Sequence, residues 1–479
     1  MLELAQIAGA PQVLEWQKRL VQLAPTPENE LGLAAAALQF ETPPYPTAKT
    51  TLLALSAKAP RSVACHMLAA ELALKNKQPA DAEMHFSDAL RLDPTNTLCE
   101  FNLAVLQLSS TNPAIAGSAR RTLLKLTQTP ALAANALQWL VSDSIQHADY
   151  ACALRSSQRL LALDSASIDD RLVHASLLAR LDDPSFPAHL ADTQFLALTN
   201  GWNLYAVSTW MLQQGLVDQC LEWLTNLPPA CRTEPGAQFG QADCFSACKS
   251  WNRLEQFLGA ADWGEFDYLR LALLSHAMAG QEREFAADGQ WRLAVRAAGE
   301  RLPALKTLLA MAQRWERPQA REELLGALTR QFPSERWAWR ELVELYTAQG
   351  NTRSLNKVYS SLYALDNSDL QAKNNLAATS LLLGQDLSRA HRLADELYSA
   401  QPGEPIVAST YAYSLHLRGR SGEALAVMER LQPGELESPA LAVYYGLLLK
   451  SQGQGGKAVR YLALGRKGRL LPEEKVLAE

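Results

Sequence analysis

The sequence predicts an all-α protein built from a repeated pair of helices. Three observations lead to this fold class: equivalent small residues recur about every 34 positions, apolar residues recur at i, i+3, i+4 and i+7, and Gly or Pro separates the helical patterns. Apolar residues at those intervals lie on one face of an α-helix. A fixed period of about 20 to 50 residues indicates a repeat array. With 479 residues, the chain is too long for one compact core.

The stretch "ADAEMHFSDALRLDPTN" at residues 80–96 represents the second helix of one unit. Ala82 and Ala89 are small, Phe86 between them is large, and Pro94 ends the pattern because proline cannot continue a helix interior. The position of Ala82 recurs at Ala48, Ala82, Ala116, Ala153, Cys220, Leu254, Ala286, Ala320, Leu355, Ala390, Ala424 and Ala458. Most steps in this series are 34 or 35 residues, which predicts thirteen to fourteen units.

The first helix of each unit is apolar with small residues in its middle, as in "HMLAAELAL" (66–74) and "TYAYSLHLRG" (410–419). The second helix is amphipathic, as in "EALAVMERL" (423–431). Two antiparallel helices joined by a short turn approach closely only where small residues stand at the crossing. Since one unit cannot bury its apolar face alone, neighbouring units must stack to make a core.

This pattern resembles the tetratricopeptide repeat. The unit that starts at Arg336 matches it at Trp339, Leu342, Tyr346, Gly350, Tyr359 and Leu362, and the unit that starts at Val63 matches it at Ala69, Ala82, Phe86, Ala89 and Pro94. The resemblance covers roughly residues 29–472. It implies a right-handed α-solenoid in which the first helix of each unit, called helix A, lines a concave groove. The second helix of each unit is called helix B. It also implies a non-catalytic scaffold that holds a peptide or a helix of a protein partner in that groove.

The predicted organisation has five parts. A partial N-terminal repeat (1–28) precedes an N-terminal block (29–224), an irregular joint (225–240), a C-terminal block (241–472) and a tail (473–479). The joint, "TNLPPACRTEPGAQFG", is rich in turn-forming residues. Pro184 and Pro187 predict a distorted or shortened second helix in the unit around 168–200.

Both ends of the chain carry predictions. "LELAQIAG" (2–9) has the pattern of the end of a helix A whose start would precede residue 1. We therefore expect a longer native chain, and an N-terminal anchor is one candidate for the missing part. "GRKGRLLPEEKVLAE" (465–479) predicts a charged final helix that caps the stack.

No motif predicts catalysis, a cofactor or a metal. Cys244 and Cys248 are spaced i, i+4, which places both on one helical face, but a zinc site normally takes four ligands and no second pair lies nearby in the sequence. We expect both to be small buried side chains. An enzyme that uses this pair with a distant histidine is the less favoured alternative.

Charge and hydropathy narrow the partner class. The net charge of −5 opposes non-specific nucleic-acid binding, which needs a basic surface. The sequence has no run of 18 or more apolar residues, so it predicts no membrane span in this chain. Seven cysteines, an odd number, imply no disulfide framework, and the cytoplasm is the default location. The alternative is a soluble arm of a membrane- or envelope-associated assembly for exopolysaccharide or protein export, located at the envelope if an anchor is missing here.

Candidate partner-binding residues follow from the resemblance, because positions 2, 5, 9 and 12 of each unit line the concave face of such repeats. The residues at these positions that we single out are Trp202, Tyr205, Thr209, Trp337, Arg340, Glu344, Asn375, Tyr413 and His416. Aromatic residues and Arg contribute most to interface energetics. For Trp202, Tyr205 and Tyr413, packing between units remains an equal alternative. Arg340 and Glu344 are spaced i, i+4 and can pair with each other.

One use of the family is disfavoured by the sequence. Repeats that clamp the C-terminal carboxylate of chaperones need Lys at position 5 and Asn at position 9. Position 5 is Tyr205, Arg340, Asn375 or Ser409 in the four units that carry the candidate residues, and no unit combines the two required residues. We therefore do not expect this chain to clamp a chaperone tail in that way.

Overall fold

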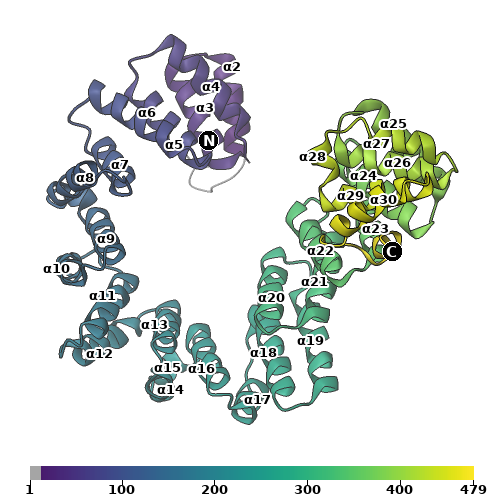
Figure 1. Ribbon diagram of the computed structural model, residues 1–479. Coiled ribbons are helices and arrows are strands. Elements are labelled where there is room, and N and C mark those ends of the chain that lie inside the picture. The colour runs from purple at the N-terminus through teal and green to yellow at the C-terminus, as the bar shows by residue number, and fades with distance from the viewer. Residues whose placement is uncertain (1–11, 42) are drawn as a thin grey trace. The chain divides into compact units, whose positions relative to one another are not determined.

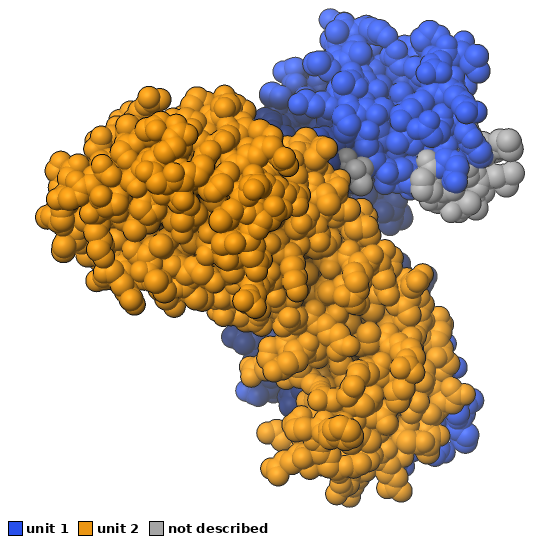
Figure 2. All heavy atoms as spheres, turned by 90° about the vertical axis from the view of Figure 1, so that its right-hand side faces the viewer, with its two compact units in different colours: residues 1–248 blue, residues 249–479 orange. Residues whose placement is uncertain are grey.

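The computed structural model describes residues 12–41 and 43–479, and these residues form helices and no strand (Figure 1). The chain divides into two compact units, unit 1 (residues 1–248) and unit 2 (residues 249–479), which Figure 2 shows in different colours. Within each unit, consecutive long helices pack against one another in chain order. The predicted all-α repeat array is confirmed.

Unit 1 begins, in its described part, with α2 (Gln12–Leu23), which packs on α3. Six helix pairs follow: α3 (Pro27–Phe40) with α4 (Pro46–Lys58), α5 (Val63–Lys75) with α6 (Pro79–Leu92), α7 (Thr97–Leu108) with α8 (Pro113–Leu126), α9 (Pro130–Gln146) with α10 (Tyr150–Leu161), α11 (Ile168–Arg180) with α12 (Phe186–Ala197), and α13 (Gly201–Gln213) with α14 (Val217–Thr225). The short α15 (Pro229–Arg232) leads to α16 (Pro235–Ala247), which packs on α13 and α14.

Unit 2 begins with α17 (Trp251–Gly259) and the 3₁₀ turn η1 (Gly264–Phe266). Six pairs follow: α18 (Asp267–Gly280) with α19 (Glu284–Ala298), α20 (Leu302–Arg314) with α21 (Pro318–Gln331), α22 (Arg336–Gln349) with α23 (Thr352–Leu365), α24 (Leu370–Leu383) with α25 (Leu387–Ala400), α26 (Pro405–Leu417) with α27 (Ser421–Met428), and α29 (Pro439–Ser451) with α30 (Gly455–Gly465). The short helices α28 (Pro433–Leu436) and α31 (Pro472–Leu477) complete the unit.

The period holds along the whole described chain. Helix A starts at residues 27, 63, 97, 130, 168, 201, 235, 267, 302, 336, 370, 405 and 439, so successive starts are 32 to 38 residues apart. Six pairs in each unit make twelve repeats. α16 and α17, on either side of the unit boundary, stand in the sequence as helices A and B of a thirteenth.

The small residues of the repeat mark where helix B meets its neighbours. Ala82 and Ala89 are fully buried and Phe86 is 4% exposed. The recurring position is usually the fourth residue of helix B, and it is buried throughout the series except in α19. There the prediction of Ala286 is wrong by one residue, because the helix starts at Glu284 and Ala287 is the buried fourth residue.

Local signals explain where the helices begin and end. Ser62 and Asn96 cap α5 and α7 by accepting hydrogen bonds from the backbone N–H groups of Cys65 and Cys99, which would otherwise lack a partner inside the helix. Gly350 ends α22 with φ of 63°, a left-handed conformation that favours glycine. Such start and stop signals are local in sequence, so the boundaries were predictable from it.

The second helix of the unit around 168–200 is regular. α12 has 12 residues, as many as α10, so the predicted shortening is wrong. Pro187 stands within its first two positions. Proline is tolerated there because the first N–H groups of a helix have no intrahelical partner in any case.

The predicted joint at 225–240 lies within unit 1. It contains the end of α14, the whole of α15 and the first residues of α16. Its Gly236 allows a close helix approach, since a β-carbon there would lie 1.8 Å from the Gly201 carbonyl oxygen. The five predicted parts of the chain stay a prediction. The helix A fragment predicted at 2–9 lies outside the described residues.

Candidate partner-binding groove

A hollow of about 460 Å³ lies along the helix A side of unit 2. Four A helices, α22, α24, α26 and α29, contribute residues at positions 2, 5, 9 or 12 of their repeats. These residues are Thr347, Asn375, Thr379, Leu382, Ile406, Ser409 and Ala440. The structure thus brings the positions that the resemblance assigned to a groove together around one hollow, which we call the groove.

Hydrogen bonds hold the polar lining of the groove in place. The Asn356 side-chain N–H₂ group donates to the Thr379 and Ser380 hydroxyl oxygens at 3.0 and 2.8 Å. The Thr379 hydroxyl in turn donates to the Asn375 carbonyl oxygen at 2.7 Å. The Ser409 hydroxyl donates to the Ile406 carbonyl oxygen at 2.8 Å. The Asn356 bonds join α23 to α24, whereas the Thr379 and Ser409 hydroxyls bond within their own helices.

The C-terminal segment, residues 468–477 of the same chain, lies in the groove and lines one side of the hollow that is left, and Leu355 and Tyr359 of α23 line another part. Gly468, Arg469, Leu470, Leu471 and Glu474 all line the hollow, and α31 packs against α29 and α24. The predicted final helix therefore exists. Its position differs from a cap that only closes the last pair, because it crosses back onto helix A of an earlier repeat.

Two hydroxyl groups hold the adjacent carboxylates of this segment. The Tyr444 hydroxyl donates to Glu474 Oε1 at 2.7 Å, and the Thr352 hydroxyl donates to Glu473 Oε2. Burial, followed by the nearby Glu474 carboxylate, raises the pKa of Tyr444 well above its ordinary value. The Tyr444 hydroxyl consequently stays protonated and remains a hydrogen-bond donor at neutral pH.

An apolar contact anchors the end of the segment. Leu477 packs against a cluster on α24, α25, α26 and α29, whose members are Leu381, Leu382, Ala390, Tyr413, Tyr444 and Leu447. At the start of α31, the Pro472 ring lies 3.4 Å from the position that a β-carbon on Gly350 would take. The helix α31 is thus in contact with the repeats at its start, at its end and through its two carboxylates.

The three candidate residues on α24 and α26 have different surroundings. Asn375 lines the groove. Tyr413 is only 7% exposed, and its ring centroid is 5.3 Å from that of Tyr444, in the cluster that receives Leu477. His416 Nδ1 is 2.9 Å from the Ser421 hydroxyl oxygen, and burial lowers the pKa of this histidine. Tyr413 is therefore a packing residue beneath the C-terminal segment.

The three candidates on α22 do not line the hollow. The Trp337 indole N–H donates to Glu335, and the Lys306 ammonium lies 5.1 Å from the centroid of the Trp337 ring. Arg340 and Glu344 are both exposed, and no ion pair joins them within residues 12–41 and 43–479. Their role in binding stays a prediction.

The three candidates on α13 lie where this helix meets α16. The Tyr205 hydroxyl donates to Asp243 Oδ2 at 3.2 Å, and its ring meets Phe239 edge-on with centroids 5.9 Å apart. Trp202 is 55% exposed. Thr209 Oγ1 is buried, with no hydrogen-bond partner among the described residues. Tyr205 thus joins two A helices, and partner binding by these three residues stays a prediction.

Of the groups that hold the C-terminal segment, the sequence indicated Tyr413 but neither of the two hydroxyl donors. Thr352 begins a helix B and Tyr444 is not at one of the four groove positions. The run Pro472-Glu473-Glu474 did predict a helix start, because acidic residues and proline favour the first turn. Nothing local could show that Glu473 meets Thr352, which is 121 residues away.

The two cysteines of the pair differ in burial. Cys244 is fully buried in α16, in the same core cluster as Cys220 of α14, whereas Cys248 is exposed just after the end of α16. The expectation that both are buried is therefore wrong for Cys248. No group of three or more His, Cys, Asp or Glu side chains in the described part of the chain could hold a metal ion.

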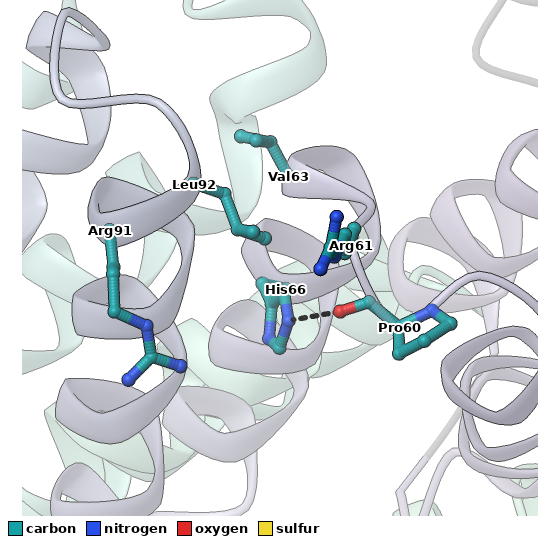
Figure 3. Close-up of a pocket in the computed structure, with 6 residues that line it drawn as sticks. All are labelled: Pro60, Arg61, Val63, His66, Arg91 and Leu92. Carbon is teal, nitrogen blue, oxygen red and sulfur yellow. Dashed lines mark hydrogen bonds between the residues drawn. The ribbon is translucent and has the colours of Figure 1, made fainter.

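Hollows also lie elsewhere on the two units, among them one on each. One, of about 630 Å³ in unit 1, is lined by Pro60, Arg61, Val63, His66, Arg91 and Leu92. Figure 3 shows His66 Nε2 hydrogen-bonded to the Pro60 carbonyl oxygen, at 3.3 Å. The other, of about 920 Å³ in unit 2, contains Trp291 and Trp315, and His276 stacks on Trp315 with centroids 4.2 Å apart.

The kind of repeat follows from the helices themselves: pairs that recur every 32 to 38 residues, with a small or aliphatic residue buried near the start of helix B. The repeats are tetratricopeptide-like. A scan against models of known protein families gives no match for this chain, and a search of curated proteins gives none either. No helix among the described residues is both long enough and apolar enough to cross a membrane.

Solved structures with similar folds include two repeat proteins. A tetratricopeptide repeat protein from Parabacteroides merdae ATCC 43184 is 16% identical, with a TM-score of 0.28, and the match covers 50% of this chain and 96% of that one. A chain of Naa15/Naa10 bound to HypK-THB is 14% identical, with a TM-score of 0.25, and the match covers 98% of this chain and 75% of that one. At these scores the description of the repeats rests on this chain's own helices.

Proposed function

We propose that this protein is a non-catalytic scaffold that binds a peptide or a helix of a protein partner along the helix A side of its repeats. The observation that carries the proposal is the groove of unit 2, where helix A residues surround a hollow and already hold a short segment of chain. A surface that holds one short segment through side-chain contacts has the shape and the hydrogen-bonding groups to hold another.

The test compares the proteins recovered by affinity capture with the parent protein and with two variants, each of which carries one substitution to arginine. Asn375→Arg places a long charged side chain in the groove, whereas Ser399→Arg places one on the exposed side of α25. Both purified variants should keep the circular dichroism spectrum and the melting temperature of the parent protein. We expect proteins captured by the parent and by Ser399→Arg to be lost with Asn375→Arg, and the purified partner to bind in a one-to-one complex. Equal capture by both variants would show that the groove is not the binding surface.

The alternative, a soluble arm of an envelope-associated export assembly, stays a prediction. The same capture experiment distinguishes the two, because that alternative expects membrane or envelope proteins of one export system among the captured partners.

A further inference from the structure

The C-terminal segment reaches the groove from the far end of unit 2. Glu473 is bound by Thr352 at the start of α23, and Leu477 reaches the cluster that includes Leu381 of α24. These contacts connect the last residues of the chain with helices about 100 residues earlier. The segment therefore bridges helix A faces of several repeats, as a bound peptide would.

The segment depends on the groove for its structure. α31 has six residues, and an isolated helix of fewer than about 12 residues is marginal in water. Its outer side is open to solvent, since Val476 is 69% exposed. A short helix with one open side loses only a few contacts when it leaves, so another segment that makes the same contacts can replace it.

The groove also extends beyond the part that the segment fills. The hollow of about 460 Å³ is lined by Leu471 of the segment and also by Asn375 and Ser409 of α24 and α26. That volume is empty of this chain's atoms although groove positions of several repeats surround it. A peptide that also filled this hollow would bury more surface than the C-terminal segment does.

We propose that residues 468–477 are an internal occupant of the groove, and that the partner is an acidic peptide that displaces them. The inference rests on the proposed function and names the chemistry of its partner. The peptide carries two adjacent acidic residues after a proline and an apolar residue three positions after the second of them, as Glu473, Glu474 and Leu477 are spaced here.

Each feature of that peptide corresponds to a group in the groove. The Thr352 and Tyr444 hydroxyls donate to the two carboxylates, and the cluster around Tyr413 receives the apolar side chain. The residues before the proline lie along the hollow lined by Asn375. Recognition thus relies on hydroxyl donors, and it needs none of the lysines that a chaperone-tail clamp uses.

The test measures binding of a fluorescein-labelled peptide, GRLLPEEKVLAE, with the sequence of residues 468–479, to the full-length chain by fluorescence anisotropy. The variant E473Q/E474Q weakens the internal contact. The matched control D192N/E222Q removes two exposed acidic side chains of unit 1. Hydrogen exchange of residues 472–478 reports whether the segment has left the groove, and light scattering reports the oligomeric state.

We expect the peptide to bind E473Q/E474Q about tenfold more tightly than the parent chain or the control, and a peptide with Gln in place of both Glu to bind at least about tenfold more weakly. Three results would overturn the proposal: unchanged exchange at 472–478 with no peptide binding, released residues 472–478 without peptide binding, or a dimer that exchanges the segment between two copies. If the peptide fails while capture still depends on Asn375, the acidic partner is wrong and the scaffold function stands.

Discussion

At the scale of single residues, Tyr444 shows how little holds the C-terminal segment. Tyr444→Phe keeps the buried ring and removes the hydroxyl that donates to Glu474. The loss of one hydrogen bond costs about 1 kcal/mol, so we expect amide exchange at residues 472–478 to rise about fivefold. Tyr411→Phe is the control, because its ring stacks on Tyr398 away from the segment. Equal exchange in both variants would mean that this hydrogen bond does not hold α31.

His174 predicts a pH dependence of stability. Burial, followed by the nearby His189, lowers the pKa of His174 to about 4, and its Nδ1 is 2.8 Å from the Ser157 hydroxyl oxygen. In the unfolded chain the pKa is about 6.5, so between these values the unfolded state binds more protons. The contribution of His174 to the free energy of unfolding is fully present above about pH 6.5. It falls by about 3 kcal/mol as the pH drops to about 4.

Urea unfolding at several pH values between 7 and 4 measures this contribution. We expect the unfolding free energy of the parent protein to depend more steeply on pH than that of His174→Gln. The difference in slope corresponds to about one more proton bound on unfolding. The same slope in both proteins would show that folding does not lower the pKa of His174.

At the scale of helices, glycine sets how closely two A helices approach. Gly236→Ala would place a β-carbon 1.8 Å from the Gly201 carbonyl oxygen, so α13 and α16 must separate. Overpacking of this kind costs about 1 to 3 kcal/mol. Gly117→Ala in α8 is the matched control, where the nearest atom is Arg121 Nη1 at 3.8 Å. It should gain about 0.5 to 1 kcal/mol, because alanine favours the helix.

Thermal unfolding of the two alanine variants measures the difference. A lower melting temperature for Gly236→Ala and a slightly higher one for Gly117→Ala is the expected pair of results. A higher melting temperature in both variants would mean that helix propensity decides the outcome and that close packing at Gly236 does not.

At the scale of the whole molecule, the array consists of contacts between sequence neighbours, so damage should stay local. Gly446→Ala would place a β-carbon 2.7 Å from Leu462 Cδ2 and 3.0 Å from the Leu462 backbone nitrogen, which pushes α30 from α29. We expect faster hydrogen exchange in α26 to α31 and unchanged exchange in unit 1. Faster exchange throughout residues 12–248 would show instead that the two units unfold as one.

Much of the fold was predictable because its signals are local. The buried fourth residue of helix B, the proline at the start of a helix and the glycine at its end all act within a few residues of their own position. The prediction at Ala286 missed Ala287 by one because the start of α19 has no such marker. The prediction for α12 failed because proline at the start of a helix costs little.

The candidate site was predictable only in part. The repeat register placed Asn375 and its equivalents on the groove side, since residues at fixed positions of successive units face the same way. The register could not show how each side chain is covered. Tyr413 has the position of a groove residue, yet it is buried beneath the C-terminal segment. Tyr205 has that position too and bonds to Asp243 of the next helix A.

The helices, their pairing and most of the residues at the crossings were predictable, because a helix and its turn depend on neighbours a few positions away. What occupies the groove depends instead on contacts between distant parts of the chain. The contact of Glu473 with Thr352 joins residues 121 positions apart, and no periodic pattern records such a contact. Its existence depends on a six-residue helix that gains its stability from the surface on which it lies.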